Sequence, residues 1–124
     1  MIKEIMLVGL GGGVGSILRY LSAVCSQKIC NTVFPAGTFF VNLLGCLIIG
    51  LLIGVIEHRQ MLDENCRLLF VTGFCGGFTT FSAFSAESLR LFESGHVLSG
   101  ILYVTASVLI GTAAVWLGIW MLKQ

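Results

Sequence analysis

The sequence predicts an all-α membrane protein of four transmembrane helices, with the third helix broken in the middle of the membrane. Three observations support this prediction. Of 124 residues, 56% are hydrophobic and 10% are charged, whereas soluble domains carry roughly 25% charged residues. The few charges separate four long apolar stretches. One stretch contains a Gly-Gly pair followed by two threonines, which is a poor composition for a continuous helix.

The overall composition excludes several classes of protein. A mean hydropathy of +0.99 is incompatible with a soluble globular domain and with a disordered chain. Seven basic residues against six acidic ones give a net charge of +1. This balance excludes the basic surface that nucleic-acid binding requires and a polybasic lipid-binding face. We therefore expect the lipid bilayer as a partner and no nucleic acid.

The charges place the four spans within a single membrane domain, residues 1–124. A hydrocarbon core about 30 Å thick needs about 20 apolar residues per helix. The helices are expected near residues 4–26, 36–57, 67–93 and 97–122. The stretches lack the alternation of barrel strands, and helices satisfy their own backbone in lipid. Lys3 and the apolar run after it also fit a signal peptide, but Arg19 interrupts the run and three spans follow, so we expect no cleavage.

The third span carries the most informative segment, Thr72–Ser85. Gly76 and Gly77 in mid-span, followed by Thr79 and Thr80, predict a break around residues 76–80. Backbone groups freed at membrane depth are tolerated where protein or a cavity meets them, and they commonly coordinate ions. The alternative is a glycine packing notch in an intact helix.

Lysine and arginine residues are divided almost evenly between the two sides of the predicted bundle. The side with both chain ends holds Lys3, Arg59, Arg67 and Lys123, and the opposite side holds Arg19, Lys28 and Arg90. Because the positive-inside rule orients a chain by this asymmetry, so small a bias allows insertion both ways and an antiparallel dimer. Insertion in one orientation stays an alternative. Four helices enclose little space, so a path for a polar solute is expected between subunits.

Glycines at four-residue spacing indicate close contact between helices. Gly11 and Gly15 form one G-x-x-x-G motif, and Gly50 and Gly54 form another. Small residues allow helix backbones to approach each other in lipid, where no hydrophobic drive brings them together. These contacts lie either within one subunit or between two.

Two polar side chains in the apolar spans admit two interpretations each. Arg19 is either an anchor that extends to the interface beside Tyr20, or a positive charge at an aqueous vestibule that attracts anions. Asn42 provides either an interhelical hydrogen bond or an amide donor in a polar path.

Further candidates follow in the third and fourth spans. Phe81 and Phe84 share a helix face. In one interpretation this face contacts lipid or the core of the bundle. In the other, the positive ring edges face a small anion. Hydroxyl residues accompany the two phenylalanines in the third span, at Thr79, Thr80, Ser82 and Ser85. The fourth span offers a second polar row, with Tyr103 and Ser107 one helical turn apart. Glu87 and Arg90 are expected to form a surface pair.

The remaining reactive residues argue against rival functions. The five cysteines form no C-x-x-C motif and are interpreted as small hydrophobes, which disfavours a thiol oxidoreductase or a zinc site. A small multidrug exporter needs a carboxylate within the membrane, whereas every acid here lies at a predicted helix end or loop. A non-catalytic membrane subunit is a third alternative.

Three segments resemble the signatures of a known family. These are residues 12–20 (GGVGSILRY), 37–45 (GTFFVNLLG) and 73–84 (GFCGGFTTFSAF). Together they resemble the CrcB/Fluc family of bacterial fluoride channels in motif order, length and number of spans. The third segment is highly specific to that family. The resemblance spans nearly the whole chain.

The resemblance implies a function and an assembly. Members are antiparallel, dual-topology homodimers with two fluoride pores along the subunit interface. They are ion channels, not enzymes, and they export cytoplasmic fluoride passively, which lowers its toxicity. We therefore expect a multi-pass protein of the bacterial cytoplasmic (inner) membrane with fluoride as its ligand.

The resemblance also implies roles for individual residues. Asn42, Phe81 and Phe84 would face the fluoride ion, and Arg19 would lie at the vestibule. The hydroxyl track would include Thr80, Ser82, Tyr103 and Ser107. The backbone carbonyls of Gly76 and Thr79 would hold a structural sodium ion on the dimer axis.

The chain departs from the family pattern at two positions. Ala83 stands where members often carry a hydroxyl residue, and Gly111 falls on the expected hydroxyl row of the fourth helix. Whether Thr112 replaces the hydroxyl missing at Gly111 is left open by the sequence.

Overall fold

All structured segments of the chain are helical in the computed structural model, which describes residues 1–124. The helices are α1 (Ile2–Ile29), α2 (Ala36–Gly54), α3 (Glu64–Cys66), α4 (Gly76–Phe78), α5 (Phe81–Glu93) and α6 (Val97–Lys123), with π-helical segments η1 (Val55–Arg59) and η2 (Arg67–Cys75). Four stretches are long and apolar enough to cross a membrane, at Ile2–Ile29, Ala36–Arg59, Glu64–Glu93 and Val97–Lys123. The predicted all-helical chain with four spans is therefore confirmed.

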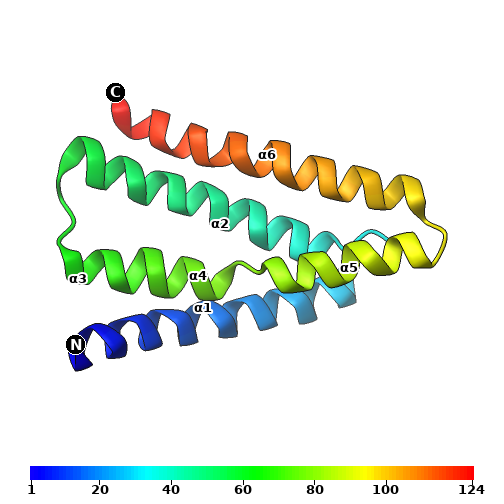
Figure 1. The fold of residues 1–124 in the computed structure, drawn as a ribbon, viewed down its shortest axis with the longest axis horizontal. Coiled ribbons are helices and arrows are strands. Elements are labelled where there is room, and N and C mark those ends of the chain that lie inside the picture. Colours follow the sequence, from blue (N-terminus) through cyan, green and yellow to red (C-terminus); the bar gives the residue numbers. More distant parts are fainter.

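The four stretches lie side by side and alternate in direction (Figure 1). Both chain ends and the turn at residues 60–63 lie at one end of the molecule, and the connections at residues 30–35 and 94–96 lie at the other. Helix α2 packs mainly against α6, and α1 packs mainly against η2 and α4. The third stretch thus lies between α1 on one side and the α2–α6 pair on the other.

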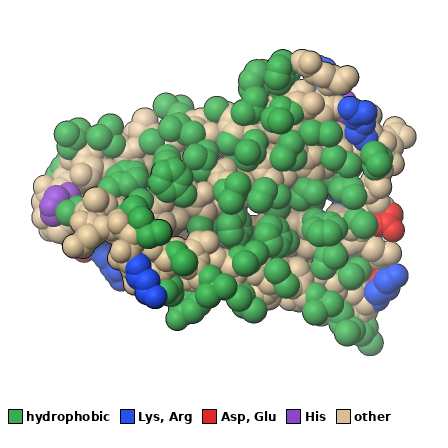
Figure 2. Space-filling view, turned by 180° about the vertical axis from the view of Figure 1, so that it is seen from behind, with side chains coloured by type: hydrophobic (Ala, Val, Ile, Leu, Met, Phe, Trp, Pro, Cys, Tyr) green, Lys and Arg blue, Asp and Glu red, His purple; other side chains and the backbone are tan.

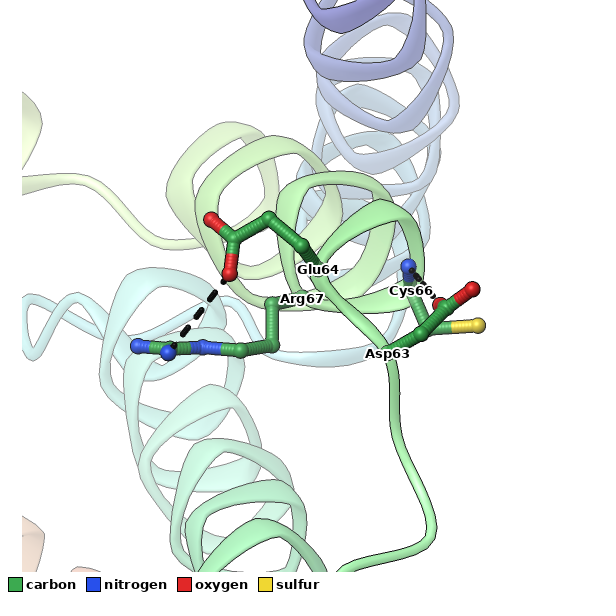
Figure 3. A network of polar contacts seen from close by, with 4 residues as sticks. All are labelled: Asp63, Glu64, Cys66 and Arg67. Atoms are coloured by element: carbon green, nitrogen blue, oxygen red, sulfur yellow. Dashed lines mark hydrogen bonds and ion pairs between the residues drawn. The ribbon is translucent and has the colours of Figure 1, made fainter.

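The third stretch begins at a side-chain cap rather than at the first apolar residue. Asp63 accepts a hydrogen bond from the backbone N–H of Cys66 at 2.9 Å, and this bond holds the pKa of Asp63 below its ordinary value (Figure 3). Glu64 and Arg67 form an exposed ion pair at 3.7 Å one turn apart. Because this first turn is polar and exposed, hydropathy placed the start of the stretch at residue 67.

The surface shows the pattern of a protein immersed in lipid. Hydrophobic side chains cover the middle of the face in Figure 2, and charged side chains gather at its two ends. Few apolar side chains are buried within the chain: Val41, Cys75, Phe78, Leu91 and Tyr103. In lipid, exposed apolar surface carries no penalty, so packing between helices depends on close contact instead of on a large apolar core.

The glycine motifs form packing seams within one chain. A Cβ atom on Gly15 would meet the carbonyl oxygen of Phe74 and would lie 2.7 Å from the amide nitrogen of Phe78. A Cβ atom on Gly50 would similarly lie 2.9 Å from Cα of Val115 in α6. Both motifs therefore allow backbone-to-backbone contact, α1 against η2–α4 and α2 against α6.

We expect Gly15→Ala to destabilise the protein, because its methyl group has no space at the α1–α4 seam and overpacking costs about 1–3 kcal/mol. Gly13→Ala in the same helix is the matched control, since a Cβ atom there meets nothing within 4 Å. Thermal unfolding in detergent should give a lower midpoint for Gly15→Ala and an unchanged or higher midpoint for Gly13→Ala. Equal midpoints would contradict the seam.

Candidate functional site

Two residues separate α4 from α5 and have extended backbone. Thr79 has φ −87° and ψ 158°, and Thr80 has φ −148° and ψ 121°. Gly76, Gly77 and Phe78, which lie within the range of the predicted break, are helical. The extended Thr79–Thr80 pair leaves backbone donors and acceptors without their usual helical partners, and those groups need others.

Asn42 on α2 satisfies the backbone of Thr80 completely. Its Nδ2 donates to the Thr80 carbonyl oxygen at 3.0 Å, and its Oδ1 accepts from the Thr80 N–H at 2.8 Å. The side-chain amide therefore pairs with Thr80 much as a neighbouring backbone would. One Nδ2 hydrogen of Asn42 is not used by these two bonds.

Further hydrogen bonds satisfy some of the other groups at the interruption. Arg19 Nε on α1 donates to the Gly77 carbonyl oxygen at 3.0 Å. Thr80 Oγ1 accepts from the Ala83 N–H at 3.2 Å and so caps α5. Thr79 donates through both its N–H and its hydroxyl to the Cys75 carbonyl. The carbonyl oxygens of Gly76 and Thr79 accept no hydrogen bond from another part of the chain.

A cavity of about 510 Å³ opens beside the interruption, between the third stretch, α2 and α6. We call it the main cavity. It brings together most of the residues that sequence analysis selected: Asn42, Gly76, Thr79, Thr80, Phe81, Phe84 and Ser107. Its wall is mostly apolar with a few polar groups, which is the character of a ligand site.

The two phenylalanines differ in exposure. Phe81 is 79% exposed, whereas Phe84 is partly buried and packs edge-on against the ring of Tyr103, with centroids 5.1 Å apart. The rings of Phe81 and Phe84 are themselves 5.8 Å apart and tilted by 40°. Both rings line the main cavity, so their edges are available to whatever enters it.

Ser107 is the one buried polar side chain without a hydrogen-bond partner. Its Oγ is enclosed by the protein and meets no donor or acceptor, and Ser107 is one of the residues that line the main cavity. Leaving a buried hydroxyl unpaired costs about 1–3 kcal/mol. An orphan buried hydroxyl of this kind is uncommon in native structures.

The other predicted hydroxyls have partners within the chain. The Tyr103 hydroxyl is fully buried and donates to Glu87 Oε2 at 2.9 Å. Ser82 Oγ lies 3.3 Å from Thr80 Oγ1 on the exposed face. Thr112 donates to the carbonyl of Val108 in its own helix and is exposed.

Glu87 is a site residue that sequence analysis missed. Its Oε1 accepts from Thr38 at 2.8 Å and its Oε2 accepts from Tyr103 at 2.9 Å. The expected pair with Arg90 is wrong, because Glu87 points into the bundle where hydroxyls on α2 and α6 meet it, and it forms no ion pair. The three residues come from three helices, so no spacing in the sequence signals them.

Glu87 and Arg19 line a second cavity of about 390 Å³. We call it the outer cavity. Thr80 and Thr38 also line it, and Thr80 lines the main cavity as well. Arg19 is half-buried and its Nε donates to the carbonyl oxygen of Gly77.

Comparison with known proteins identifies the family. Residues 6–119 match the family model described as CrcB-like protein, Camphor Resistance (CrcB). The chain belongs to this family. Among curated CrcB-like relatives, the protein of Azobacteroides pseudotrichonymphae is 48% identical over 95% of this chain and 94% of its own length, and that of Phocaeicola vulgatus is 47% identical over 96% and 98%. A third, from Flavobacterium psychrophilum, is 43% identical over 98% of both chains. All three are named fluoride-specific ion channel FluC.

We expect Asn42→Leu to destabilise the interruption, because it leaves the Thr80 N–H and carbonyl unpaired at about 1–3 kcal/mol each. Amide hydrogen exchange should accelerate at Thr80, and the unfolding midpoint in detergent should fall. Thr112→Val is the control, since its hydroxyl bonds only its own helix. If exchange at Thr80 is unchanged in Asn42→Leu, Asn42 does not hold the interruption.

Proposed function

We infer that this chain is a fluoride channel and not an enzyme, and that it lets fluoride leave the cytoplasm passively. Family membership and the names of its relatives support the fluoride assignment. The observation in the structure that supports it most directly is the unpaired hydroxyl of Ser107, a residue of the main cavity's wall. A hydroxyl donor without a partner matches a small anion that accepts strong hydrogen bonds.

The proposed pathway replaces the water around fluoride with weak, neutral donors. Ser107 with its unpaired hydroxyl, Asn42 with one unused Nδ2 hydrogen, and the aromatic residues Phe81 and Phe84 all belong to the wall of the main cavity. Conduction requires binding that is favourable enough for entry but weak enough for exit. Neutral dipoles meet this requirement better than a buried cation, which would trap the ion.

Arg19 and Glu87 occupy the outer cavity and have different proposed tasks. The Arg19 guanidinium adds positive charge at an entrance that leads towards Thr80, which both cavities share. Glu87 accepts from Tyr103 and Thr38, so these hydroxyls are directed at the carboxylate. We propose that Tyr103 serves the pathway by orienting Phe84, whose ring it contacts edge-on.

The proposed working unit is an antiparallel homodimer with two pores. The main cavity is a surface feature of one chain, and Phe81 beside it is 79% exposed. A second copy would cover this face and convert each open cavity into an enclosed path. The small difference in basic charge between the two sides supports insertion in both orientations, in a bacterial cytoplasmic membrane.

A sodium ion fits the interruption. The carbonyl oxygens of Gly76 and Thr79 lack hydrogen-bond donors from elsewhere in the chain, and the space beside Gly76 is open. Carbonyl oxygens of unwound membrane helices are typical sodium ligands. A bound cation would offset the repulsion between carbonyls that converge at the dimer axis, and its role is structural.

We expect reconstituted protein to release fluoride from liposomes passively and to reject chloride. Fluoride release should proceed without a pH gradient. Glu87 is the only acidic residue that is not exposed, so it is the residue through which proton coupling would act. A fluoride electrode and a chloride electrode measure the two fluxes. Equal fluxes would contradict selectivity, and a strict requirement for a pH gradient would indicate proton coupling through Glu87.

Phe81→Ile and Phe84→Ile should each reduce fluoride flux by about tenfold or more and leave the oligomeric state unchanged. The reason is that an aliphatic side chain has no positive ring edge. Loss of a contact worth about 1.4 kcal/mol corresponds to a tenfold change. Phe40→Ile is the control, since Phe40 is 62% exposed and lines a separate, wholly apolar groove. Normal flux in both variants would remove the ring-edge mechanism.

Orientation can be tested with a variant that retains only the exposed Cys30 at one end of the bundle and has serine at Cys25, Cys46, Cys66 and Cys75. A membrane-impermeant maleimide applied to intact cells should label about half of the copies if insertion is unbiased. Labelling of all copies or of none would show a single orientation and overturn the antiparallel dimer.

A further inference from the structure

Two of the five cysteines lie in the wall of the main cavity. Cys46 on α2 is half-buried, and Cys75 at the end of η2 is 2% exposed. Both are free thiols. The other three cysteines line no part of this cavity, so Cys46 and Cys75 are distinct in position from the rest.

The register between α2 and the third stretch puts Cys46 and Cys75 at the same level of the bundle. The two segments run in opposite directions, and Asn42 pairs with Thr80. A Cβ atom on Gly45 would meet the side chain of Thr79. Cys46 follows Asn42 by one helical turn, and Cys75 precedes Thr79 by one turn. The same register therefore brings Cys46 to the level of Cys75.

The surroundings select one class of ligand. No group of three or more His, Cys, Asp or Glu side chains is placed to hold a metal ion, so a tetrahedral zinc site has no ligand set. Two thiols without further donors suit a soft univalent ion that accepts two sulfur ligands, such as Cu(I) or Ag(I). Gly111 on α6 leaves room beside the sulfur of Cys46. A Cβ atom built on Gly111 would lie 3.4 Å from Cys46 Sγ, and glycine has no such atom.

We propose that Cys46 and Cys75 form a binding site for a soft univalent metal ion in the wall of the main cavity, and that the bound ion blocks the passage of anions. Each thiol releases its proton to solvent as its sulfur–metal bond forms, and no electron is transferred. Two thiolates and one univalent cation carry a net charge of −1. The complex therefore replaces two neutral groups with a negative charge that repels an approaching anion.

Binding can be measured in detergent without reference to transport. The protein is prepared with Cys25, Cys30 and Cys66 replaced by serine, which leaves only the cavity pair, and is titrated with silver nitrate in chloride-free buffer. We expect one Ag(I) per chain with two protons released per ion. Cys46→Ala and Cys75→Ala on this background should each weaken binding by more than about 100-fold, because even outer-shell substitutions cost 10–100-fold.

The variants also provide an internal check on folding. If Cys75→Ala does not fold, Cys75→Val fills the buried position and serves in its place. Binding that is absent, or that survives the loss of either thiol, overturns the site.

The block rests on the proposed function and is measured separately in proteoliposomes. For each protein, the efflux rate with Ag(I) is divided by the efflux rate of the same protein without Ag(I). We expect Ag(I) to lower this ratio at least about tenfold in the two-thiol protein. In Cys46→Ala we expect Ag(I) to leave the efflux rate unchanged. Normal efflux with silver bound overturns the block. Absence of efflux before silver is added overturns the proposed function instead, and the titration then still decides the metal site.

Discussion

The arrangement of this protein depends on the hydrogen bonds made by the backbone of Thr79 and Thr80. An extended pair inside a membrane helix exposes groups that lipid cannot satisfy. Asn42 from α2 pairs with Thr80 on both its N–H and its carbonyl, and Arg19 from α1 donates to Gly77. Two neighbouring helices therefore hold the interruption in place.

The same bonds explain why the few polar side chains of the apolar spans have more than one task. Asn42 uses an acceptor and one donor for Thr80, which leaves one donor unused on a residue that lines the main cavity. Glu87 accepts from Thr38 and Tyr103, and it lines the outer cavity and not the main one. The only buried hydroxyl left unpaired is that of Ser107.

Sequence analysis recovered the features whose causes are local. The charges mark the four spans, and the glycine spacing of Gly11 and Gly15 indicated a seam that the structure places against η2 and α4. It selected seven of the residues that line the main cavity. It failed at Glu87, because proximity to Arg90 in the sequence suggested a pair that the direction of the side chain does not allow. Helical spacing gives neighbours on one helix but not the partner on the next.

The amino-acid sequence by itself determined that this chain crosses a membrane four times and that its third span contains residues poor at continuing a helix. Those properties are sums over neighbouring residues, such as hydropathy and helix propensity, and they need no knowledge of packing. Only the tertiary structure decided that Asn42 meets Thr80, that Thr38 and Tyr103 meet Glu87, and that Cys46 and Cys75 share one cavity. Each of these pairings depends on the register between helices, which is set by backbone contact at glycine and by the direction of individual side chains.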